Sequence, residues 1–444
     1  MTVDLVLKNA KILLGQKIER AGIAVDSGYI VKIAKDVNLP AASDKIDVKE
    51  FLVLPGLIDV HIHLRDQELS YKEDFVSGTS AAANGGVTTV LDMPNNKPVT
   101  MDASSLRERM AAASEKLIVN AGFLSAFPSN VKEIPDIVKE GAKGFKLYMS
   151  EKIGGIDPSD DELITKALVE TQKLNIPVCI HAEDKQLLEI IYEEKKKNKD
   201  ATIDAFLHVH SQDAEVKAIE RILNLAQKSK AKIHICHVST SKGVELIEMA
   251  KKTELKVTCE VTPHHLLLTY ENLKELGIIG LTKPPLRLKD DVRSLWTGLQ
   301  KGVVDTIASD HAPHSLDEKK KTSFWQIPSG IAGLETMLPL MLTQVNKGLL
   351  SLPKLVETTS KRPRDVFGIR ERGEIREGHI ADLVAVDLKK EWTIDSSKFY
   401  SKAKFSPFDG WKVKGKPVKT FINGHLVMDN GEVFTDVKRG RIIR

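Results

Sequence analysis

The sequence predicts an α/β fold, a (β/α)8 barrel of the TIM type joined to a small composite β domain built from both termini. Three observations predict it. The chain has 444 residues, of which 42% are hydrophobic and 28% charged, the balance of a globular protein with a large core. Both ends consist of short strand-like runs. Between them, apolar runs alternate with longer helical stretches, which is the pattern of a barrel of parallel strands.

The N-terminal end contains short β-like runs separated by Gly and Asp. These runs cover residues 4–14, 18–26, 29–34 and 51–54. The C-terminal end has the same pattern of short β-like runs from about residue 373. These runs cover residues 381–386 and 418–427, the latter around an Asn423-Gly424 turn. Neither end alone is long enough to bury a satisfactory core. We therefore expect residues 1–53 and 368–444 to share one β domain, and residues 54–367 to form the barrel.

Eight apolar runs define the strands of the predicted barrel. They begin near Leu57, Val87, Leu117, Gly144, Pro177, Lys232, Lys256 and Asp305. The stretches between them, such as 214–228 and 243–252, carry the spacing of Ala, Leu, Ile and Glu that is typical of amphipathic helices. We interpret the lysine-rich stretch 193–199 as the solvated face of a helix.

Charge and cysteine content exclude several classes of protein. Lys and Arg number 65 against 61 Asp and Glu, a net charge of +4, which is too balanced for a nucleic-acid or membrane surface. No run of eighteen apolar residues occurs, and the first residues lack the features of a signal peptide. Cys179, Cys236 and Cys259 each lie in an apolar run, and an odd number of buried thiols indicates a reducing compartment. We expect a cytoplasmic protein.

The first predicted barrel strand carries polar residues at alternate positions. Asp59, His61, His63 and Arg65 are separated by apolar residues, so alternation predicts that all four face the same side. Two imidazoles about 7 Å apart along a strand can bind one metal ion. Burying four polar side chains without partners would be costly, and a metal site resolves that cost.

Further candidate ligands follow at the ends of later strands. Lys146, His181, His237 and Asp310 each end a predicted strand, and catalytic residues of such barrels lie at that rim. These residue types indicate a metal-assisted hydrolase. A buried Lys146 would be neutral, paired, or converted by carbon dioxide to a carbamate that bridges two metals. Alternation predicts that Cys236, next to His237, points away from the metal into the core.

Six motifs together resemble the amidohydrolase superfamily and, within it, the dihydroorotase family of the type with a lysine bridge. The resemblance covers essentially the whole chain. The motifs are residues 55–65 (PGLIDVHIHLR), 92–96 (DMPNN), 144–148 (GFKLY), 234–238 (HICHV), 262–266 (TPHHL) and 309–314 (SDHAPH).

The resemblance implies a role for each matching residue. Two zinc ions per subunit would be bound, one by His61 and His63, the other by His181 and His237, with carboxylated Lys146 bridging both. Asp310 would bind the first metal and also transfer a proton as the catalytic residue. The residues implied to bind a substrate carboxylate are Arg65, Asn95, His314 and, near them, Lys283.

The implied reaction is the reversible, zinc-dependent closure of N-carbamoyl-L-aspartate to L-dihydroorotate in de novo pyrimidine (UMP) biosynthesis. Allantoinases and hydantoinases or dihydropyrimidinases share the metal residues, but Arg65 and Asn95 favour a substrate with a carboxylate. An inactive scaffold that partners aspartate transcarbamoylase is a further alternative, although all six expected ligands are present here. Besides the small-molecule substrate we expect no nucleic acid or membrane partner, with a homo-oligomer and an association with aspartate transcarbamoylase as further candidates.

Overall fold

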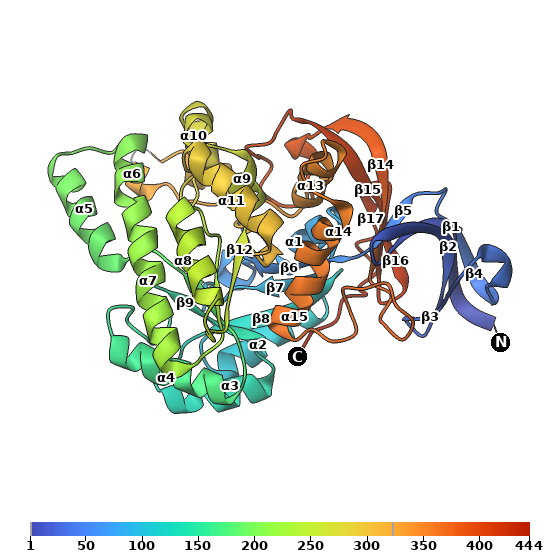
Figure 1. Ribbon diagram of the computed structural model, residues 1–444, viewed down its shortest axis with the longest axis horizontal. Coiled ribbons are helices and arrows are strands. Elements are labelled where there is room, and N and C mark those ends of the chain that lie inside the picture. Colours follow the sequence, from blue (N-terminus) through green and yellow to red (C-terminus); the bar gives the residue numbers. More distant parts are fainter. Residues whose placement is uncertain (1, 322–323) are drawn as a thin grey trace.

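The computed structural model describes residues 2–321 and 324–444 and contains a parallel barrel beside a separate β sheet (Figure 1). Each of the eight predicted strand starts falls within three residues of an observed strand, so the predicted barrel is confirmed. The eight parallel strands are β6 (Leu57–Ile62), β7 (Val87–Asp92), β8 (Asn120–Ala126), β9 (Gly144–Tyr148), β10 (Val178–His181), β11 (Ile233–Ile235), β12 (Val257–Val261) and β13 (Thr306–Ile307).

Helices surround the barrel, and several begin at side chains that cap their first turn. The Asp74 carboxylate accepts the backbone N–H of Ser77 at 2.8 Å, and Asp102 accepts that of Ser105 at 2.7 Å. The helices are α1 (Phe75–Asn84), α2 (Ala103–Ser114), α3 (Ile134–Glu140), α4 (Asp161–Lys173), α5 (Lys185–Lys197), α6 (Ile203–Val209), α7 (Gln212–Ser229), α8 (Ser241–Lys251), α9 (Pro263–Leu267), α10 (Tyr270–Leu276), α11 (Lys289–Lys301), α12 (Leu316–Lys319), α13 (Met337–Asn346), α14 (Leu352–Val356) and α15 (Arg362–Phe367).

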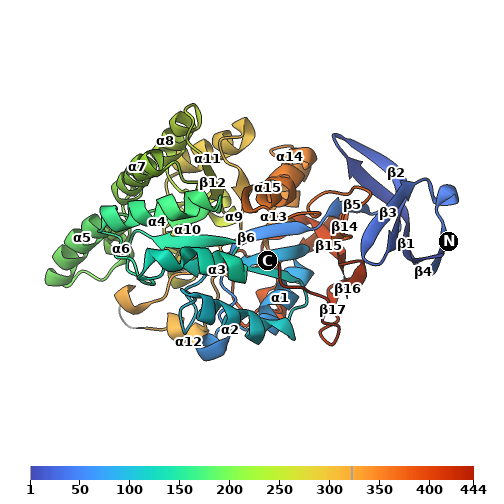
Figure 2. The ribbon, with the colours of Figure 1, turned by 90° about the horizontal axis from the view of Figure 1, so that it is seen from below.

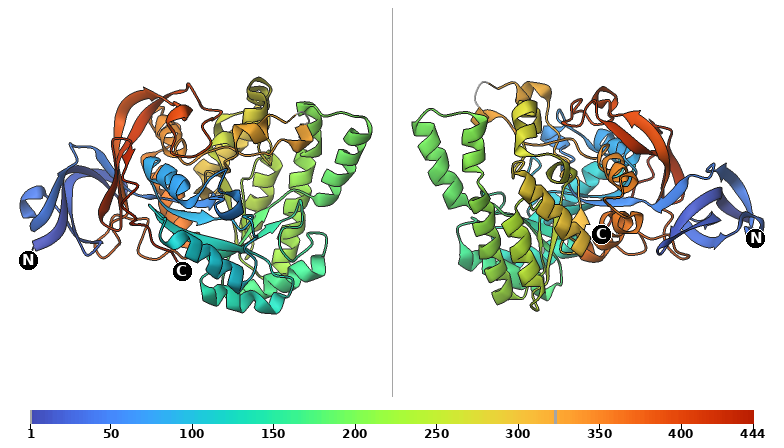
Figure 3. Two further views of the ribbon diagram at one scale, coloured as in Figure 1. Left: turned by 180° about the vertical axis from the view of Figure 1, so that it is seen from behind. Right: turned by 45° about the horizontal axis from the view of Figure 1, so that its top comes forward.

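Two extra helices, α5 and α6, follow β10 and project from the side of the barrel that lies away from the β sheet (Figures 1 and 3). Lys196 and Lys197 lie on the last turn of α5 and are exposed, which agrees with the predicted solvated face. No helix among the described residues has the length and apolar character that crossing a membrane requires.

Backbone and side-chain hydrogen bonds close the barrel between its first and last strands. The last strand, β13, has only two residues, and the chain that follows it continues the contact. The backbone N–H of His63 donates to the carbonyl of His311 at 2.8 Å. The buried Asp59 carboxylate accepts the backbone N–H of Ser309 at 3.1 Å. Asp59 therefore joins the two ends of the barrel and does not line the cavity described below.

The second sheet has nine strands and is formed by both ends of the chain, as the sequence predicted. Its central contact is antiparallel, between β5 and β14, where Pro55 pairs with Leu383 and Val53 with Ala385. The prediction missed β4, an exposed strand that pairs in parallel with β1. The strands are β1 (Thr2–Leu14), β2 (Lys17–Asp26), β3 (Tyr29–Ala34), β4 (Ala41–Asp47), β5 (Leu52–Pro55), β14 (Leu383–Thr393), β15 (Lys412–Ile422), β16 (His425–Asp429) and β17 (Glu432–Val433).

The last residues of the chain return to the barrel and pair with the start of β8, and Figure 2, seen from below, shows the C-terminus in front of the barrel. Ala121 donates its N–H to the carbonyl of Arg441 at 3.0 Å and accepts the N–H of Ile443 at 2.8 Å. The side chain of Asn120 accepts the N–H of Arg441 at 3.0 Å. The C-terminal segment is thus part of the barrel base.

The interior of the barrel corrects one expectation about β6. Strict alternation would put Ile58, Val60, Ile62 and Leu64 on one face, but the register shifts between Asp59 and Ile62. Ile62 and Leu64 pack in the outer core. Ile58 and Val60 instead pack inside the barrel in a buried cluster, with Leu91, Met93, Leu124, Cys179, Cys236, Ala308, Phe367 and Ile369. The irregular pairing allows the strand to send apolar residues inward at its start and histidines inward at its end.

Candidate active site

All ten residues singled out from the sequence line one cavity of about 340 Å3. The cavity lies at the carboxyl ends of the barrel strands, where loops from several strands meet. Ser150 and Glu151 from the loop after β9, and Trp325 to Gly330, form other parts of its wall. The ten residues are His61, His63, Arg65, Asn95, Lys146, His181, His237, Lys283, Asp310 and His314.

Three of them form one compact group of potential ligand atoms. The Nε2 atoms of His61 and His63 both lie 3.3 Å from Oδ1 of Asp310. One ligand atom from each residue lies within 4.8 Å of the other two, and all three residues form part of the buried interior. Burial would raise the pKa of Asp310, but the imidazoles of His61 and His63 outweigh it and hold that pKa well below its usual value.

A second pair of histidines lies beside this group. Nδ1 of His181 is 3.0 Å from Nε2 of His237, and the ring centroids of His61 and His237 are 5.3 Å apart. Burial lowers the pKa of His63 to about 3 and that of His237 well below its usual value, so both rings are neutral at neutral pH. A neutral imidazole is the form that binds a metal ion.

Lys146 lies among these histidines with an exposed fraction of 1%. Its Nζ lies 3.1 Å from Sγ of Cys236 and 5.1 Å from the centre of the Tyr148 ring. Among the described residues, no carboxylate forms an ion pair with it. A buried ammonium group with only a thiol partner is a costly arrangement.

Two buried carboxylates that do not line the cavity orient the candidate ligand histidines. The sequence did not lead us to predict either of them. Glu260 accepts from Nδ1 of His61, from Nε2 of His234 at 3.0 Å and from the backbone N–H of His237 at 3.1 Å. Glu183 accepts from Nε2 of His181 at 2.7 Å. Such carboxylates fix the tautomer and the orientation of ligating imidazoles.

The other oxygen of Glu183 accepts from Nδ1 of His210 at 2.8 Å. His210 directly follows the last residue of α6 and is buried, whereas His208, two residues earlier, is exposed. A buried Glu183 two residues after a candidate ligand was the signal that could have identified this contact.

The backbone adopts an unusual conformation at three of the cavity residues. Arg65, His237 and Asp310 have φ angles of 55°, 36° and 45°, in the left-handed region that non-glycine residues seldom adopt. Such conformations gather at functional sites. At His237 this breaks the alternation of β11, so Cys236 points inward to Lys146. Cys236 belongs to the buried core, as predicted, but the prediction that it points away from the site was wrong for this reason.

Arg65 places a positive charge in the wall of the cavity. Its guanidinium has contacts of 3.4 Å with the carbonyl of Pro313 and with Nε2 of His314, and the residue is 7% exposed. No carboxylate among the described residues forms an ion pair with it. Burial lowers the pKa of His314 to about 4, so this ring is neutral at pH 7 and the charge comes from Arg65.

His314 and Asn95 each already contact a neighbouring group. The carbonyl of Ser329 lies 3.1 Å from Nε2 of His314 and accepts its hydrogen, while Nδ1 accepts from Lys72 at 3.3 Å. Oδ1 of Asn95 accepts from Nδ1 of His63 at 2.6 Å, which directs the other nitrogen of that ring to Asp310. The amide nitrogen of Asn95 is then available to a ligand in the cavity.

The donor set fits metal ions. His61 lies between the carboxylates of Glu260 and Asp310, which raise its pKa to about 10 although burial and Lys146 lower it. Two carboxylates around one imidazole favour a positive charge on that ring. Either a proton or a metal ion bound to Nε2 would supply this charge. Imidazole and carboxylate groups at the carboxyl rim of a barrel define a class of proteins, the metal-dependent hydrolases.

Comparison with known proteins agrees with that class. The model of the amidohydrolase family matches residues 52–427, and the chain belongs to that family. A protein of Methanothermobacter thermautotrophicus named dihydroorotase is 38% identical over 97% of this chain and 95% of its own length. A dihydroorotase of Pyrococcus furiosus is 38% identical over 99% and 96% of the two chains.

Solved structures show the same fold over the whole chain. The L-hydantoinase (dihydropyrimidinase) from Arthrobacter aurescens superposes with a TM-score of 0.95, is 32% identical and covers 100% of both chains. A D-hydantoinase superposes with a TM-score of 0.92 at 27% identity over 100% of this chain and 99% of its own. The barrel and the accompanying β sheet are therefore shared with enzymes named for another ring substrate.

Proposed function

We propose that this chain is a dihydroorotase, which closes N-carbamoyl-L-aspartate to L-dihydroorotate and reverses that reaction, as a step of pyrimidine biosynthesis. One observation carries the proposal: the buried guanidinium of Arg65 faces the cavity beside the histidine cluster with no carboxylate partner among the described residues. A buried cation without a partner requires an anionic ligand. The carboxylate of L-dihydroorotate supplies one, whereas an unsubstituted hydantoin or dihydrouracil ring does not.

Each residue has a defined task in this reaction. The fork of N–H groups on Arg65 binds the substrate carboxylate, and the amide of Asn95 donates beside it. Lys283, which also lines the cavity, adds a second positive charge. His314 donates its Nε2 hydrogen to the carbonyl of Ser329, and it can donate that hydrogen to the substrate when the hydrogen bond to Ser329 is broken. These contacts hold the ring amide over the histidine cluster.

Two zinc ions, held by His61, His63, Asp310, His181, His237 and a carboxylated Lys146, would supply Lewis-acid activation of the amide carbonyl and of water. Asp310 has the position of a proton carrier, because its carboxylate lies at the cavity wall and its low pKa keeps it ionised. In ring opening it takes a proton from water and delivers it to the departing ring nitrogen. Ring closure consumes one proton and releases water, so acid favours dihydroorotate.

Ring-opening assays of the purified chain on L-dihydroorotate, dihydrouracil, hydantoin and allantoin test the function. We expect turnover of L-dihydroorotate and little on the uncharged rings. Equal efficiency on dihydrouracil and L-dihydroorotate would move the chain to the hydantoinase or dihydropyrimidinase group, to which the L-hydantoinase with the same fold belongs. Preference for allantoin would move it to the allantoinases, and inactivity on all four rings with metals bound would favour a scaffold.

The carboxylation of Lys146 has a test of its own. We expect about two zinc ions per chain, as a two-metal site requires. Lys146→Ala should lose metal and activity, with partial rescue by short carboxylic acids, whereas the exposed Lys139→Ala should change neither. An experimental map of the active, metal-loaded protein with an unmodified Lys146 would contradict the proposal.

The cellular setting of the chain is part of the same proposal. Three buried cysteines without disulfides support a reducing compartment, the cytoplasm. Assembly of several copies, or with aspartate transcarbamoylase, stays a prediction from the resemblance.

A further inference from the structure

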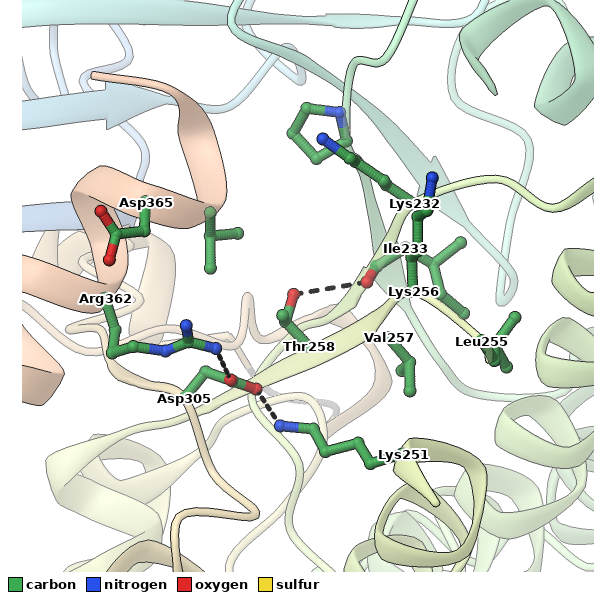
Figure 4. A pocket seen from close by; sticks show the side chains of 12 residues that line it. Lys232, Ile233, Lys251, Leu255, Lys256, Val257, Thr258, Asp305, Arg362 and Asp365 are labelled. Carbon is green, nitrogen blue, oxygen red and sulfur yellow. Dashed lines mark hydrogen bonds and ion pairs between the residues drawn. The ribbon is translucent and has the colours of Figure 1, made fainter. Parts of the chain in front are cut away.

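A second pocket, of about 400 Å3, lies at the amino-terminal end of the barrel, opposite the candidate active site (Figure 4). We call it the amino-end pocket. It is lined by residues at or beside the starts of β11, β12 and β13, and by side chains of α15. Ile233 and Val257 are the first residues of β11 and β12, whereas the candidate active site lies where those strands end. The proposed reaction uses none of its residues.

Four cations and two carboxylates line the pocket. The Asp305 carboxylate is buried and accepts three hydrogen bonds. It accepts from Lys251 at 2.5 Å, from the guanidinium of Arg362 and from the backbone N–H of Cys259 at 2.9 Å. Asp305 therefore holds two of the cations in place against the pocket wall.

The second carboxylate, Asp365, pairs with Arg364 at 2.8 Å. The remaining two cations, Lys232 and Lys256, form no ion pair with a carboxylate among the described residues, and Figure 4 shows them across the pocket from Arg362. Burial lowers the pKa of Lys232, and repulsion from the charge of Lys256 lowers it further. An anion between them would relieve this repulsion.

The remaining surface of the pocket differs in character. Ile233, Leu255 and Val257 supply apolar side chains beside the lysines. The guanidinium of Arg362 has more N–H groups than its contact with Asp305 uses. A volume of about 400 Å3 exceeds that of an inorganic ion and falls in the range of sites for small organic ligands.

We propose that the amino-end pocket binds a phosphorylated organic metabolite of the size of a nucleoside monophosphate. The phosphate lies between Lys232, Lys256 and Arg362, and the organic group lies on the apolar wall. Arginine and lysine together are the usual partners of a phosphate group.

Calorimetric titration of the zinc-loaded full chain tests this with three probes: adenosine 5′-monophosphate, inorganic phosphate and adenosine. We expect the monophosphate to bind more tightly than phosphate, because only it reaches the apolar wall, and adenosine not to bind. Lys232→Gln/Lys256→Gln should weaken monophosphate binding by at least about tenfold. Lys252→Gln, which removes a nearby exposed lysine outside the pocket, should leave it unchanged.

Ring-opening activity serves as the folding control, because neither lysine belongs to the active site and the double variant should keep wild-type turnover. Equal monophosphate affinity in the wild type and the double variant would place the ligand elsewhere, including at the metals, and would overturn the proposal. So would the absence of monophosphate binding at millimolar concentration, or adenosine binding as tight as that of the monophosphate.

Discussion

At the residue scale, the candidate active site is ordered by groups that do not reach the substrate cavity. Glu260 has no exposed surface and contacts His61, His234 and the backbone of His237 together. Glu183 does the same for His181 from the other side. Because these carboxylates occupy one ring nitrogen of His61 and of His181, the other nitrogen of each of these two rings is directed into the cavity. The orientation of the cluster is therefore set before any ligand binds.

Asp310→Asn separates proton transfer from ligand binding. The amide keeps an oxygen near His61 and His63 but cannot accept a proton, so kcat should fall by at least about a hundredfold. Turnover of L-dihydroorotate and zinc content should be measured on the same sample. Asp317→Asn, at an exposed site, is the control. Near-normal turnover of the Asp310 variant would show that another group carries the proton.

Arg65→Met tests recognition of the substrate carboxylate. Loss of one charged hydrogen-bonding partner should raise KM for L-dihydroorotate by a factor that corresponds to about 1.5–3 kcal/mol, with a smaller effect on kcat. Steady-state kinetics beside Arg107→Met, which removes an exposed guanidinium that does not line the cavity, provide the comparison. Unaltered kinetics in Arg65→Met would remove the basis for choosing a carboxylate-bearing substrate.

The residues that could be predicted are those carried by motifs at strand ends. His181 ends β10, Lys146 lies two residues before the end of β9, and both line the cavity as predicted. Glu260 was not identified, because a single carboxylate within residues 257–261 shows a contact only once the neighbouring strand is placed. Cys236 was oriented wrongly, because alternation assumes extended backbone and His237 departs from it.

At the element scale, the buried Glu335 ties the end of α1 to the segment that precedes β15. Its carboxylate accepts from the side chain of Asn84 at 2.7 Å and from the backbone N–H groups of Tyr400 at 3.0 Å and Ser401 at 3.2 Å. Burial raises its pKa to about 7 despite these hydrogen bonds. The contact between α1 and the segment that precedes β15 is therefore sensitive to pH.

Glu335→Gln should change how stability depends on pH. In the unfolded chain this carboxyl group loses its proton near its ordinary pKa of 4.5, and in the folded chain at about 7. Between these values the folded state binds more protons, so this group's contribution to the free energy of unfolding falls as pH rises. Because glutamine does not titrate, the variant lacks that loss. Its free energy of unfolding should rise by about 1–3 kcal/mol relative to that of the wild type between pH 5 and 8. Urea denaturation at each pH measures it, and a difference that does not vary with pH would contradict the assignment.

Elements were easier to predict than their pairing. Long apolar runs defined the barrel strands, and β4 was missed because its exposed residues 41–47 lack the apolar alternation of a strand. The shifted register in β6 depends on contacts with β7 that no local pattern contains. The division into domains at residues 53/54 and 367/368 stays a prediction.

At the scale of the whole molecule, the C-terminal segment holds barrel and sheet together. The side chain of Asn423 donates to the carbonyl of Arg439 at 2.7 Å, and residues 440–443 bond to the chain around Ala121. Removal of residues 439–444 should lower the free energy of unfolding by about 2–5 kcal/mol, from several hydrogen bonds of about 1 kcal/mol each. Removal of Arg444 alone, which keeps those contacts, is the control. Equal thermal unfolding midpoints for both truncations would show that the segment adds no stability.

The pairing of β5 with β14 also sets the order in which the molecule can be completed during synthesis. Strands β1 to β5 leave the ribosome first, yet the edge of β5 receives its partner only when residues 383–386 have been made. Until then the nascent chain carries an open sheet edge of apolar residues, Leu52 to Leu54, next to a barrel that is still being made. That edge therefore needs protection, for example by a chaperone, while the chain is still being synthesised, and the need ends when β14 has paired with β5.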